Sequence, residues 1–203
     1  MKTILILIVF MFIAPLCSGA QTTSGPSTLD AIIGYSLLRI QIANALAPIG
    51  LDHVNANGGQ AALIFNFAHG VGLEAQGTGY YKSLMAKELG SPATPVGKLW
   101  VYTAMVGPQF KTYTQSNVNP FIHVLFGIAR GSTSQTSLPI GAFDRNAFAA
   151  DLGGGVDFKV TGRLSLRGEI AYVYTHFPFS QTESGLGDSQ NDLKVTAALV
   201  FHL

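Results

Sequence analysis

The last twelve residues, 192–203, alternate between two kinds of side chain. The odd positions from Leu193 to Leu203 are all apolar, whereas the even positions include Lys194 and Thr196. Side chains two residues apart share one side of a β-strand, so this pattern predicts a strand with one apolar face. Its length matches the roughly 9 to 11 residues that a tilted strand needs to cross the hydrocarbon core of a bilayer. We therefore expect a terminal membrane strand that belongs to a lipid-embedded sheet.

Seven further segments repeat this alternation, and turn residues bound each of them. No long stretch has helical periodicity; the best candidate, residues 83–89, predicts one or two helical turns inside a loop. The pattern indicates an all-β fold, an eight-stranded antiparallel up-and-down transmembrane β-barrel. The predicted strands are residues 29–41, 59–68, 71–81, 99–112, 121–131, 147–158, 164–175 and 192–203.

The links between these segments alternate in length. Three are short, at residues 69–70, 113–120 and 159–163, and four are longer, at residues 42–57, 82–98, 132–146 and 176–191. Short periplasmic turns and longer extracellular loops are typical of outer-membrane barrels. We therefore expect the outer membrane of a two-membrane bacterium as the location. An even number of strands then places both termini in the periplasm.

The chain is poor in charge. Only 11% of its residues are Asp, Glu, Lys or Arg, against about 25% in ordinary soluble domains. A soluble barrel of the lipocalin type would show the same alternation with its polar face in water. Here the polar positions are rich in Gly, Ala, Ser and Thr rather than Lys and Glu, which favours the membrane barrel. A formal net charge of +1 leaves no basic stripe for nucleic acid.

The first twenty residues have the features of a secretory signal peptide. Lys2 precedes an apolar run over residues 4–16, and small residues precede a predicted cleavage after Ala20. The run is shorter than the roughly 20 residues of a membrane helix. Lipidation at Cys17 is the alternative, but the bulky Leu16 argues against it. The expected organisation is a cleaved signal peptide (1–20), a polar lead-in (21–28) and one barrel (29–203). Loss of Cys17 with the signal would leave a mature chain without cysteine.

Charged residues of the predicted strands fall on the polar face, which in a membrane barrel is the interior. The turn at residues 159–163 predicts Gly155 opposite Arg167 and Gly153 opposite Glu169, to within two residues. An isolated buried ion costs several kcal/mol, so Arg167 and Glu169 should pair with opposite charges. The alternative is that they face loop water without partners. The expected interior charge cluster is Glu74, Asp151, Asp157, Arg167, Glu169 and Lys194.

Aromatic residues gather near both ends of the predicted strands, as they do in the two interfacial belts of a lipid-facing barrel. A general strand preference for aromatics would explain their number but not their clustering. Near the short turns lie Phe65, Phe67, Phe110, Tyr113, Phe121, Phe158 and Phe201, and near the long loops lie Tyr80, Tyr81, Trp100, Tyr102, Tyr172 and Tyr174.

Several short motifs, taken in order, resemble small bacterial outer-membrane barrels of the OmpA transmembrane-domain type. They are Gly34-Tyr35-Ser36, Asn66-Phe67, Gly107-Pro108, residues 121–127, residues 153–157 and the terminal strand. The resemblance implies outer-membrane lipid and the outer-membrane assembly machinery as partners. That machinery would read the terminal strand through Leu199, Phe201 and Leu203. Proteins of this type usually end in Phe, whereas Leu203 is last here. The peptidoglycan-binding domain of OmpA is not expected.

Motifs that could carry chemistry are weak. Gly70, Gly72 and Ala75 fit a dinucleotide-binding spacing, but a strand pattern follows where a helix is required. The five histidines lack metal-ligand spacing, and no compact Ser and His pair marks a lipid-modifying barrel enzyme. We therefore predict no catalytic, cofactor or metal site. The expected role is structural or surface display with a filled lumen; a small pore or a lateral transporter of a small hydrophobic ligand is the alternative.

Overall fold

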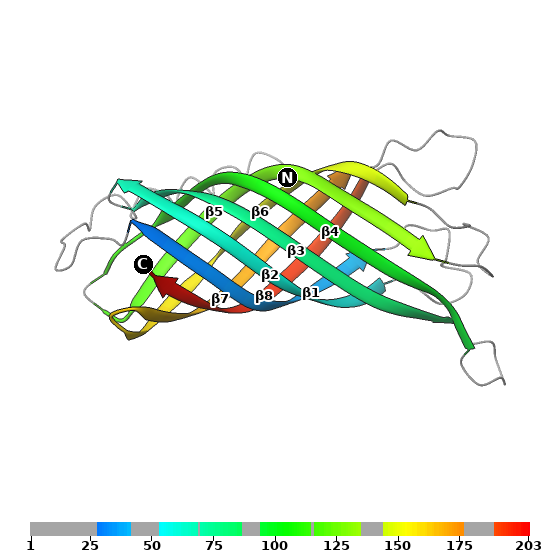
Figure 1. The fold of residues 1–203 in the computed structure, drawn as a ribbon, viewed down its shortest axis with the longest axis horizontal. Helices are drawn as coiled ribbons and strands as arrows, with labels where there is room; N and C mark the ends of the chain where they lie inside the picture. Colours follow the sequence, from blue (N-terminus) through cyan, green and yellow to red (C-terminus); the bar gives the residue numbers. More distant parts are fainter. Residues whose placement is uncertain are drawn as a thin grey trace, which may run out of the picture.

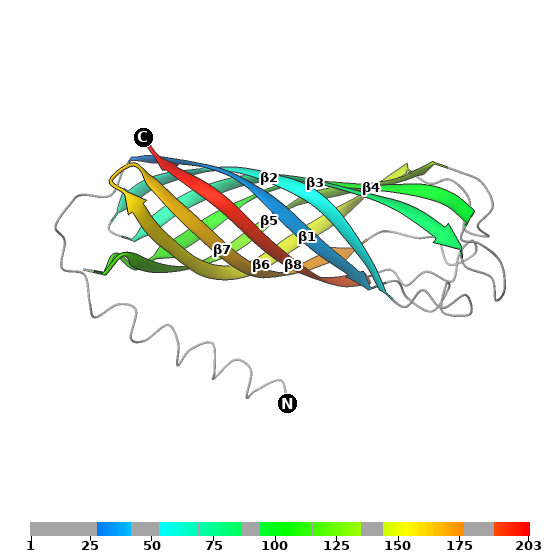
Figure 2. The same cartoon turned by 90° about the horizontal axis from the view of Figure 1, so that it is seen from below.

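The protein forms a closed barrel of antiparallel strands, seen from two sides in Figures 1 and 2. The computed structural model describes residues 28–41, 53–68, 70–86, 94–114, 116–134, 144–176 and 189–203. No helix within these ranges is long and apolar enough to span a membrane. The strands are β1 (Leu29–Gln41), β2 (His53–Ala68), β3 (Val71–Ala86), β4 (Thr94–Lys111), β5 (Val118–Ser134), β6 (Asp144–Thr161), β7 (Leu164–His176) and β8 (Ser189–His202).

The barrel closes between its first and last strands. β1 pairs with β8 in antiparallel register from Asp30 opposite His202 to Arg39 opposite Leu193. The predicted eight-stranded barrel and its closure are therefore confirmed. Closure matters in a bilayer because each backbone group left without a partner in hydrocarbon costs several kcal/mol.

Most strands are longer than the sequence pattern predicts. β3 and β4 remain paired as far as Ala86 opposite Thr94, so the helical turn predicted at residues 83–89 is wrong over its strand portion. Backbone pairing continues there after the apolar alternation has ended, which explains the difference. Residues 87–89 lie outside the described ranges, as do the predicted signal peptide and residues 21–27 of the lead-in.

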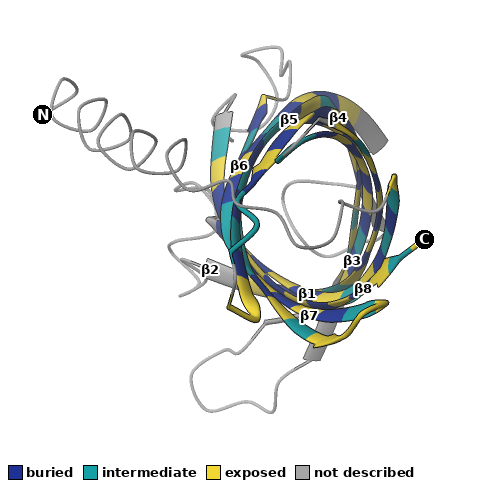
Figure 3. Ribbon diagram, turned by 90° about the vertical axis from the view of Figure 1, so that its left-hand side faces the viewer, coloured by how far each residue is buried: buried dark blue, intermediate teal, exposed yellow. Residues whose placement is uncertain are grey.

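Burial alternates along each strand, as the banded colouring in Figure 3 shows. The even positions of β8 face the interior and its odd positions face outward, as predicted. Two aromatic assignments to the belts are wrong. Tyr80 is 2% exposed and Phe121 is 3% exposed, so both side chains lie inside the barrel. Each shares the inward parity of its own strand, and parity decides the side on which a residue lies.

The pairing of β6 with β7 agrees with the prediction within its stated tolerance, at the limit of two residues. Asp157 is opposite Arg167, and Gly155 is opposite Glu169. The chain reverses over Gly162 and Arg163 alone, with a bulge between Lys159 and Thr161. A tighter reversal than the five-residue turn assumed from sequence produces this shift. It places Arg167 directly across from a carboxylate.

Candidate functional site

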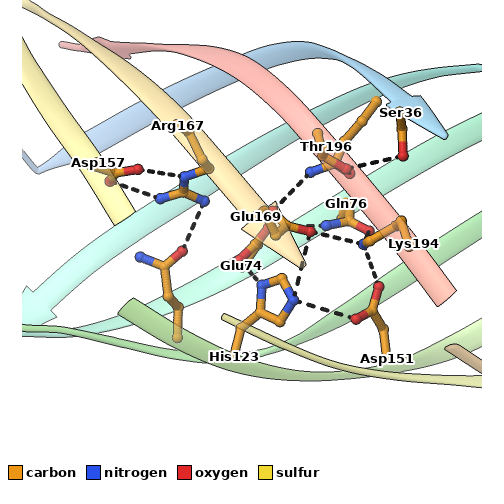
Figure 4. A network of polar contacts seen from close by, with 12 residues as sticks. Ser36, Glu74, Gln76, His123, Asp151, Asp157, Arg167, Glu169, Lys194 and Thr196 are labelled. Carbon is orange, nitrogen blue, oxygen red and sulfur yellow. Dashed lines mark hydrogen bonds and ion pairs between the residues drawn. The ribbon is translucent and has the colours of Figure 1, made fainter. Parts of the chain in front are cut away.

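The lumen holds all six residues of the predicted charge cluster, and Figure 4 shows their polar contacts. They come from four strands, β3, β6, β7 and β8, and alternate strand positions turn each of them inward. All six side chains are fully or almost fully buried. The contacts form two clusters, one towards the short turns and one in the middle of the barrel.

In the cluster towards the turns, Arg167 is held by Asp157. The Arg167 Nε and Nη2 atoms donate to the two Asp157 carboxylate oxygens at 2.7 and 3.0 Å. Lys111 Nζ lies 2.7 Å from the same carboxylate. The guanidinium also lies 3.8 Å from the ring centre of Phe121, the inward-facing aromatic. A bidentate pair of hydrogen bonds, together with an aromatic ring against the guanidinium, restricts an arginine side chain more than a single hydrogen bond does.

This cluster extends across the seam between β1 and β8. Asp30 Oδ1 lies 2.7 Å from His202 Nδ1, and Asn66 Nδ2 donates to Asp30 Oδ2 at 3.1 Å. Lys111 Nζ reaches Asp30 at 3.9 Å, which connects the seam to Asp157. The side-chain contacts therefore reinforce the backbone ladder where the barrel closes.

The central cluster is organised around Lys194 and His123. Lys194 Nζ pairs with Asp151, and it lies 3.0 Å from Glu169. His123 Nδ1 lies 3.0 Å from Glu74 Oε2. Its other ring nitrogen, Nε2, faces Asp151 at 3.4 Å and Glu169 at 4.0 Å.

Negative charge predominates in this central cluster. Glu74, Asp151 and Glu169 are three carboxylates, against the single ammonium of Lys194. His123 Nε2 and Asp151 Oδ1 are among the buried side-chain atoms, in the part of the chain described, that make no hydrogen bond, and Glu169 Oε1 has its ion pair with Lys194 Nζ. A protonated His123 would therefore face two carboxylate oxygens and offset part of the excess charge.

Neutral polar side chains connect the central cluster to the loop-side half of the lumen. Gln60 donates to Glu169 at 3.4 Å and accepts from Thr196 at 3.2 Å. Ser36 bonds both Thr196 and Tyr80, each at 3.0 Å. Beyond Tyr80, towards the long loops, the lining includes an apolar cluster. The buried residues there are Leu38, Ile40, Ala56, Tyr80 and Val173, with Leu99 and Val101 packed against them.

Sequence reasoning missed several members of this interior. Asp30, Lys111 and His123 were not assigned to the charge cluster, although each has the inward parity of its strand. Parity alone could have found them. His123 was treated as an isolated histidine because its carboxylate partners lie on β3, β6 and β7. Within the described ranges, no group of three His, Cys, Asp or Glu residues is arranged to hold a metal ion.

The outer wall of the barrel is apolar. The three terminal-strand residues, Leu199, Phe201 and Leu203, are exposed on it. Tyr113 and Tyr174 are partly exposed, and Tyr81 is exposed. Apart from the buried Tyr80 and Phe121, the other predicted belt residues are exposed as well. These are Phe65, Phe67, Phe110 and Phe158 towards the turns, with Phe201, and Trp100, Tyr102 and Tyr172 towards the loops.

Comparison with known structures finds the same fold in two outer-surface proteins. Neisserial surface protein A matches with a TM-score of 0.64 and 12% identity, over 89% of this chain and 100% of that one. The attachment invasion locus protein Ail of Yersinia pestis, in complex with the heparin analogue sucrose octasulfate, matches with a TM-score of 0.55 and 16% identity, over 87% of this chain and 100% of that one. No family model and no curated protein matches the chain. Identities this low establish the fold and nothing further.

Proposed function

We propose that this chain, which has the fold of the small eight-stranded outer-membrane β-barrels, is an integral outer-membrane protein with a structural or surface-display role. The short turns and both termini would face the periplasm, and the long loops would face outward. The assembly machinery would read the terminal strand through Leu199, Phe201 and Leu203.

One observation supports this proposal: an apolar outer wall surrounds a lumen that holds buried, paired charges. Large apolar side chains are exposed on all eight strands described, from Ile33 on β1 to Phe201 on β8. Water does not solvate such a wall favourably, whereas lipid does. Inside lie the ionic clusters and an apolar cluster that includes Leu38 and Val173. An eight-stranded barrel has an interior just wide enough for such filling.

Recording from planar bilayers separates the structural role from the pore. Purified protein should insert, as judged by strands that resist added trypsin, and should give no steady ion conductance. The same preparation after heat unfolding is the control for leakage. Steady single-channel steps from inserted protein would support the small pore instead.

Cysteine labelling in whole cells tests the orientation. Asn191 lies at the loop end of β8 and Ser116 lies in the turn before β5, and both are exposed. In the cleaved chain, Asn191→Cys should react with a membrane-impermeant maleimide on intact cells. Ser116→Cys should react only after the outer membrane is permeabilised. The opposite result would invert the proposed topology.

A vesicle assay tests lateral transport of a hydrophobic ligand. That route needs an opening between strands, whereas every neighbouring pair of described strands is hydrogen-bonded around the closed barrel. We expect no transfer of a fluorescent fatty acid across vesicles that contain the protein, beyond the rate in protein-free vesicles. Faster transfer would favour the transporter.

A further inference from the structure

Three polar side chains at the turn end of the barrel form a chain of hydrogen bonds across the seam. Asp30 lies near the start of β1, Ser165 near the start of β7 and His202 at the end of β8. These strand ends lie together at one end of the barrel (Figure 2). Because 37 positions separate Ser165 from His202 and 172 separate Asp30 from His202, spacing in the sequence does not reveal the grouping. Closure of the barrel brings the three residues into contact.

The hydrogen bonds join these residues in a definite order. His202 Nε2 lies 2.9 Å from Ser165 Oγ, and His202 Nδ1 lies 2.7 Å from Asp30 Oδ1. An ionised carboxylate only accepts hydrogen bonds, so His202 Nδ1 carries a proton and donates it to Asp30. In a neutral imidazole the other nitrogen is then an acceptor, and His202 Nε2 accepts from the Ser165 hydroxyl. This is the arrangement of a serine nucleophile, its general base and the acid that orients the base.

A second buried serine provides a contrast. Ser36 is 0% exposed, as is Ser165. The Ser36 hydroxyl bonds the hydroxyl groups of Tyr80 and Thr196, each at 3.0 Å. A hydroxyl group is too weak a base to take a proton from serine at neutral pH, whereas an imidazole is suited to it. Ser165 therefore has the partner that a nucleophile needs.

The groups around this chain orient it and add a positive charge. Asn66 Nδ2 donates to Asp30 Oδ2 at 3.1 Å, which orients the carboxylate that faces His202. Lys159, which is partly exposed, is directly across from Ser165 in the β6–β7 ladder, so the two side chains share the inner side of the wall. A cation beside a reacting carbonyl group stabilises the negative charge that develops on its oxygen.

We propose that Ser165, His202 and Asp30 form a catalytic site that cleaves small carboxylic esters, with Lys159 stabilising the oxyanion. Ser165 is the nucleophile and His202 is the general base, whereas Asp30 is a positioning residue that orients the imidazole. This activity goes beyond the structural role proposed above. It depends on closure of the barrel and not on the orientation of the barrel in the membrane.

The reaction has two steps. Ser165 Oγ bonds to the carbonyl carbon of the ester while its proton passes to His202 Nε2. The carbon–oxygen bond to the alcohol then breaks, the alcohol leaves with that proton, and an acyl ester of Ser165 remains. Water attacks this acyl ester after giving a proton to His202 Nε2. The carboxylic acid is released and the proton returns to Ser165 Oγ.

Access to Ser165 limits the size of the substrate. The Ser165 side chain is buried, whereas the His202 side chain is 14% exposed and Arg163 beside it is exposed. Backbone bonds from His202 N to Arg163 O and from Leu203 N to Leu29 O hold the end of β8. The ends of strands open locally at a lower free-energy cost than their centres do. We therefore expect small esters to enter at this end and turnover to be slow.

Covalent labelling tests the nucleophile. Purified barrel in detergent is treated with diisopropyl fluorophosphate, which forms an oxygen–phosphorus bond to an activated serine and loses fluoride. Mass spectrometry of the peptides should find the adduct on Ser165 and not on Ser36, the control within the same molecule. His202→Gln should slow labelling by about 100-fold because it removes the general base.

The pH dependence of labelling tests the role of Asp30. The wild-type rate should rise with pH as His202 loses its ring proton and becomes able to accept from Ser165. Asp30→Asn should lower the rate across the same pH range, because an amide no longer selects the tautomer with the proton on His202 Nδ1. Resistance of the strands to trypsin shows whether each variant has folded.

Hydrolysis of para-nitrophenyl acetate tests the activity itself. Wild-type protein should release nitrophenolate faster than Ser165→Ala does. Lys159→Gln should slow the release because it removes the cation beside Ser165, and Lys159→Arg should retain it.

Each outcome decides the proposal. Labelling at Ser165 together with ester turnover above the Ser165→Ala rate would support it. Equal labelling of Ser165 and Ser36, or none at either serine in a barrel that resists trypsin, would overturn it. So would turnover no faster than that of Ser165→Ala. The comparison of the two serines is made within the wild-type protein, so it stands even where a variant does not fold. Failure of the wild-type barrel to insert into bilayers would contradict the structural role alone.

Discussion

At the scale of single residues, the barrel interior is tightly packed around Gly153. A Cβ added at Gly153 would overlap His123 Nε2 and would lie 2.8 Å from the Cβ of Ala171. At Gly168, on the outer wall, an added Cβ would have nothing within 4 Å. The two glycines lie on paired strands but have opposite surroundings.

Gly153→Ala should therefore lower the free energy of unfolding by about 1–3 kcal/mol, the usual cost of overpacking a core. Gly168→Ala should be neutral or stabilising by up to about 1 kcal/mol, because alanine restricts the unfolded chain. Urea unfolding in lipid vesicles, followed by Trp100 emission, measures both. Equal effects of the two substitutions would mean that His123 does not pack against β6.

The bond between Arg167 and Asp157 should be costly to break from one side. Arg167→Met leaves a buried carboxylate with one partner fewer, and we expect a loss of about 3–5 kcal/mol. Lys159→Met, at a partly exposed position next to the turn, should cost less than about 0.5 kcal/mol.

A double-mutant cycle with Asp157→Asn isolates the pair. The coupling energy should fall within about 0.5–3 kcal/mol, because residues in one network do not contribute additively. Strict additivity in the urea measurement would show that the two groups do not interact in the lumen.

At the scale of one element, β8 separates two environments along a single strand. Thr196 is buried and bonded to Ser36 and Gln60, whereas Leu199 is 37% exposed on the outer wall. The cross-strand partners of Leu199 are Ile33 and Leu166, both exposed and apolar. The outward side of β8 is therefore apolar at Leu199 and at both of its cross-strand partners.

Leu199→Arg should destabilise the inserted barrel by about 2–4 kcal/mol if the residue lies near the bilayer midplane. Asn191→Arg, at the loop end of the same face, should cost about 0–1 kcal/mol because the penalty falls towards the interface. Vesicle unfolding in urea measures both variants. A cost for Asn191→Arg as large as that for Leu199→Arg would contradict the depth assigned to β8.

Sequence periodicity was sufficient to predict which side of a strand each residue faces, and so which charges enter the lumen. Periodicity does not specify where along the barrel axis each residue lies. Which inward residues meet depends on the stagger of the closed barrel, so the contact between His123 and Glu74 could not be read from spacing. The predicted strands were too short for a related reason. The hydrophobic alternation ends before the strands do, because the β3–β4 ladder continues to Thr94.

At the scale of the whole molecule, closure of the barrel depends on the β1–β8 seam. Ile33 and Leu199 are direct partners there, whereas Leu193 is the partner of Arg39. Antiparallel partners lie about 4.5–5.5 Å apart at Cα, a separation that a disulfide can span.

In a Cys17→Ser background, Ile33→Cys with Leu199→Cys should therefore form a disulfide on mild oxidation. Ile33→Cys with Leu193→Cys, on the same outer face but out of register, should not. Gel mobility of the unfolded chains without reductant distinguishes a closed loop from an open one. Equal oxidation of both pairs would contradict the seam register.

The seam also sets the order of events in folding. Asp30 and His202 are in contact although 172 positions separate them in the chain. Folding slows as the sequence distance between contacting residues grows, because the entropy of closing the intervening loop is lost before the contact forms. β1 pairs with β2 along one edge, but its other edge has no native partner until β8 is in place. Until then that open edge could pair with other chains. The barrel is therefore expected to close late, after β8 has been synthesised.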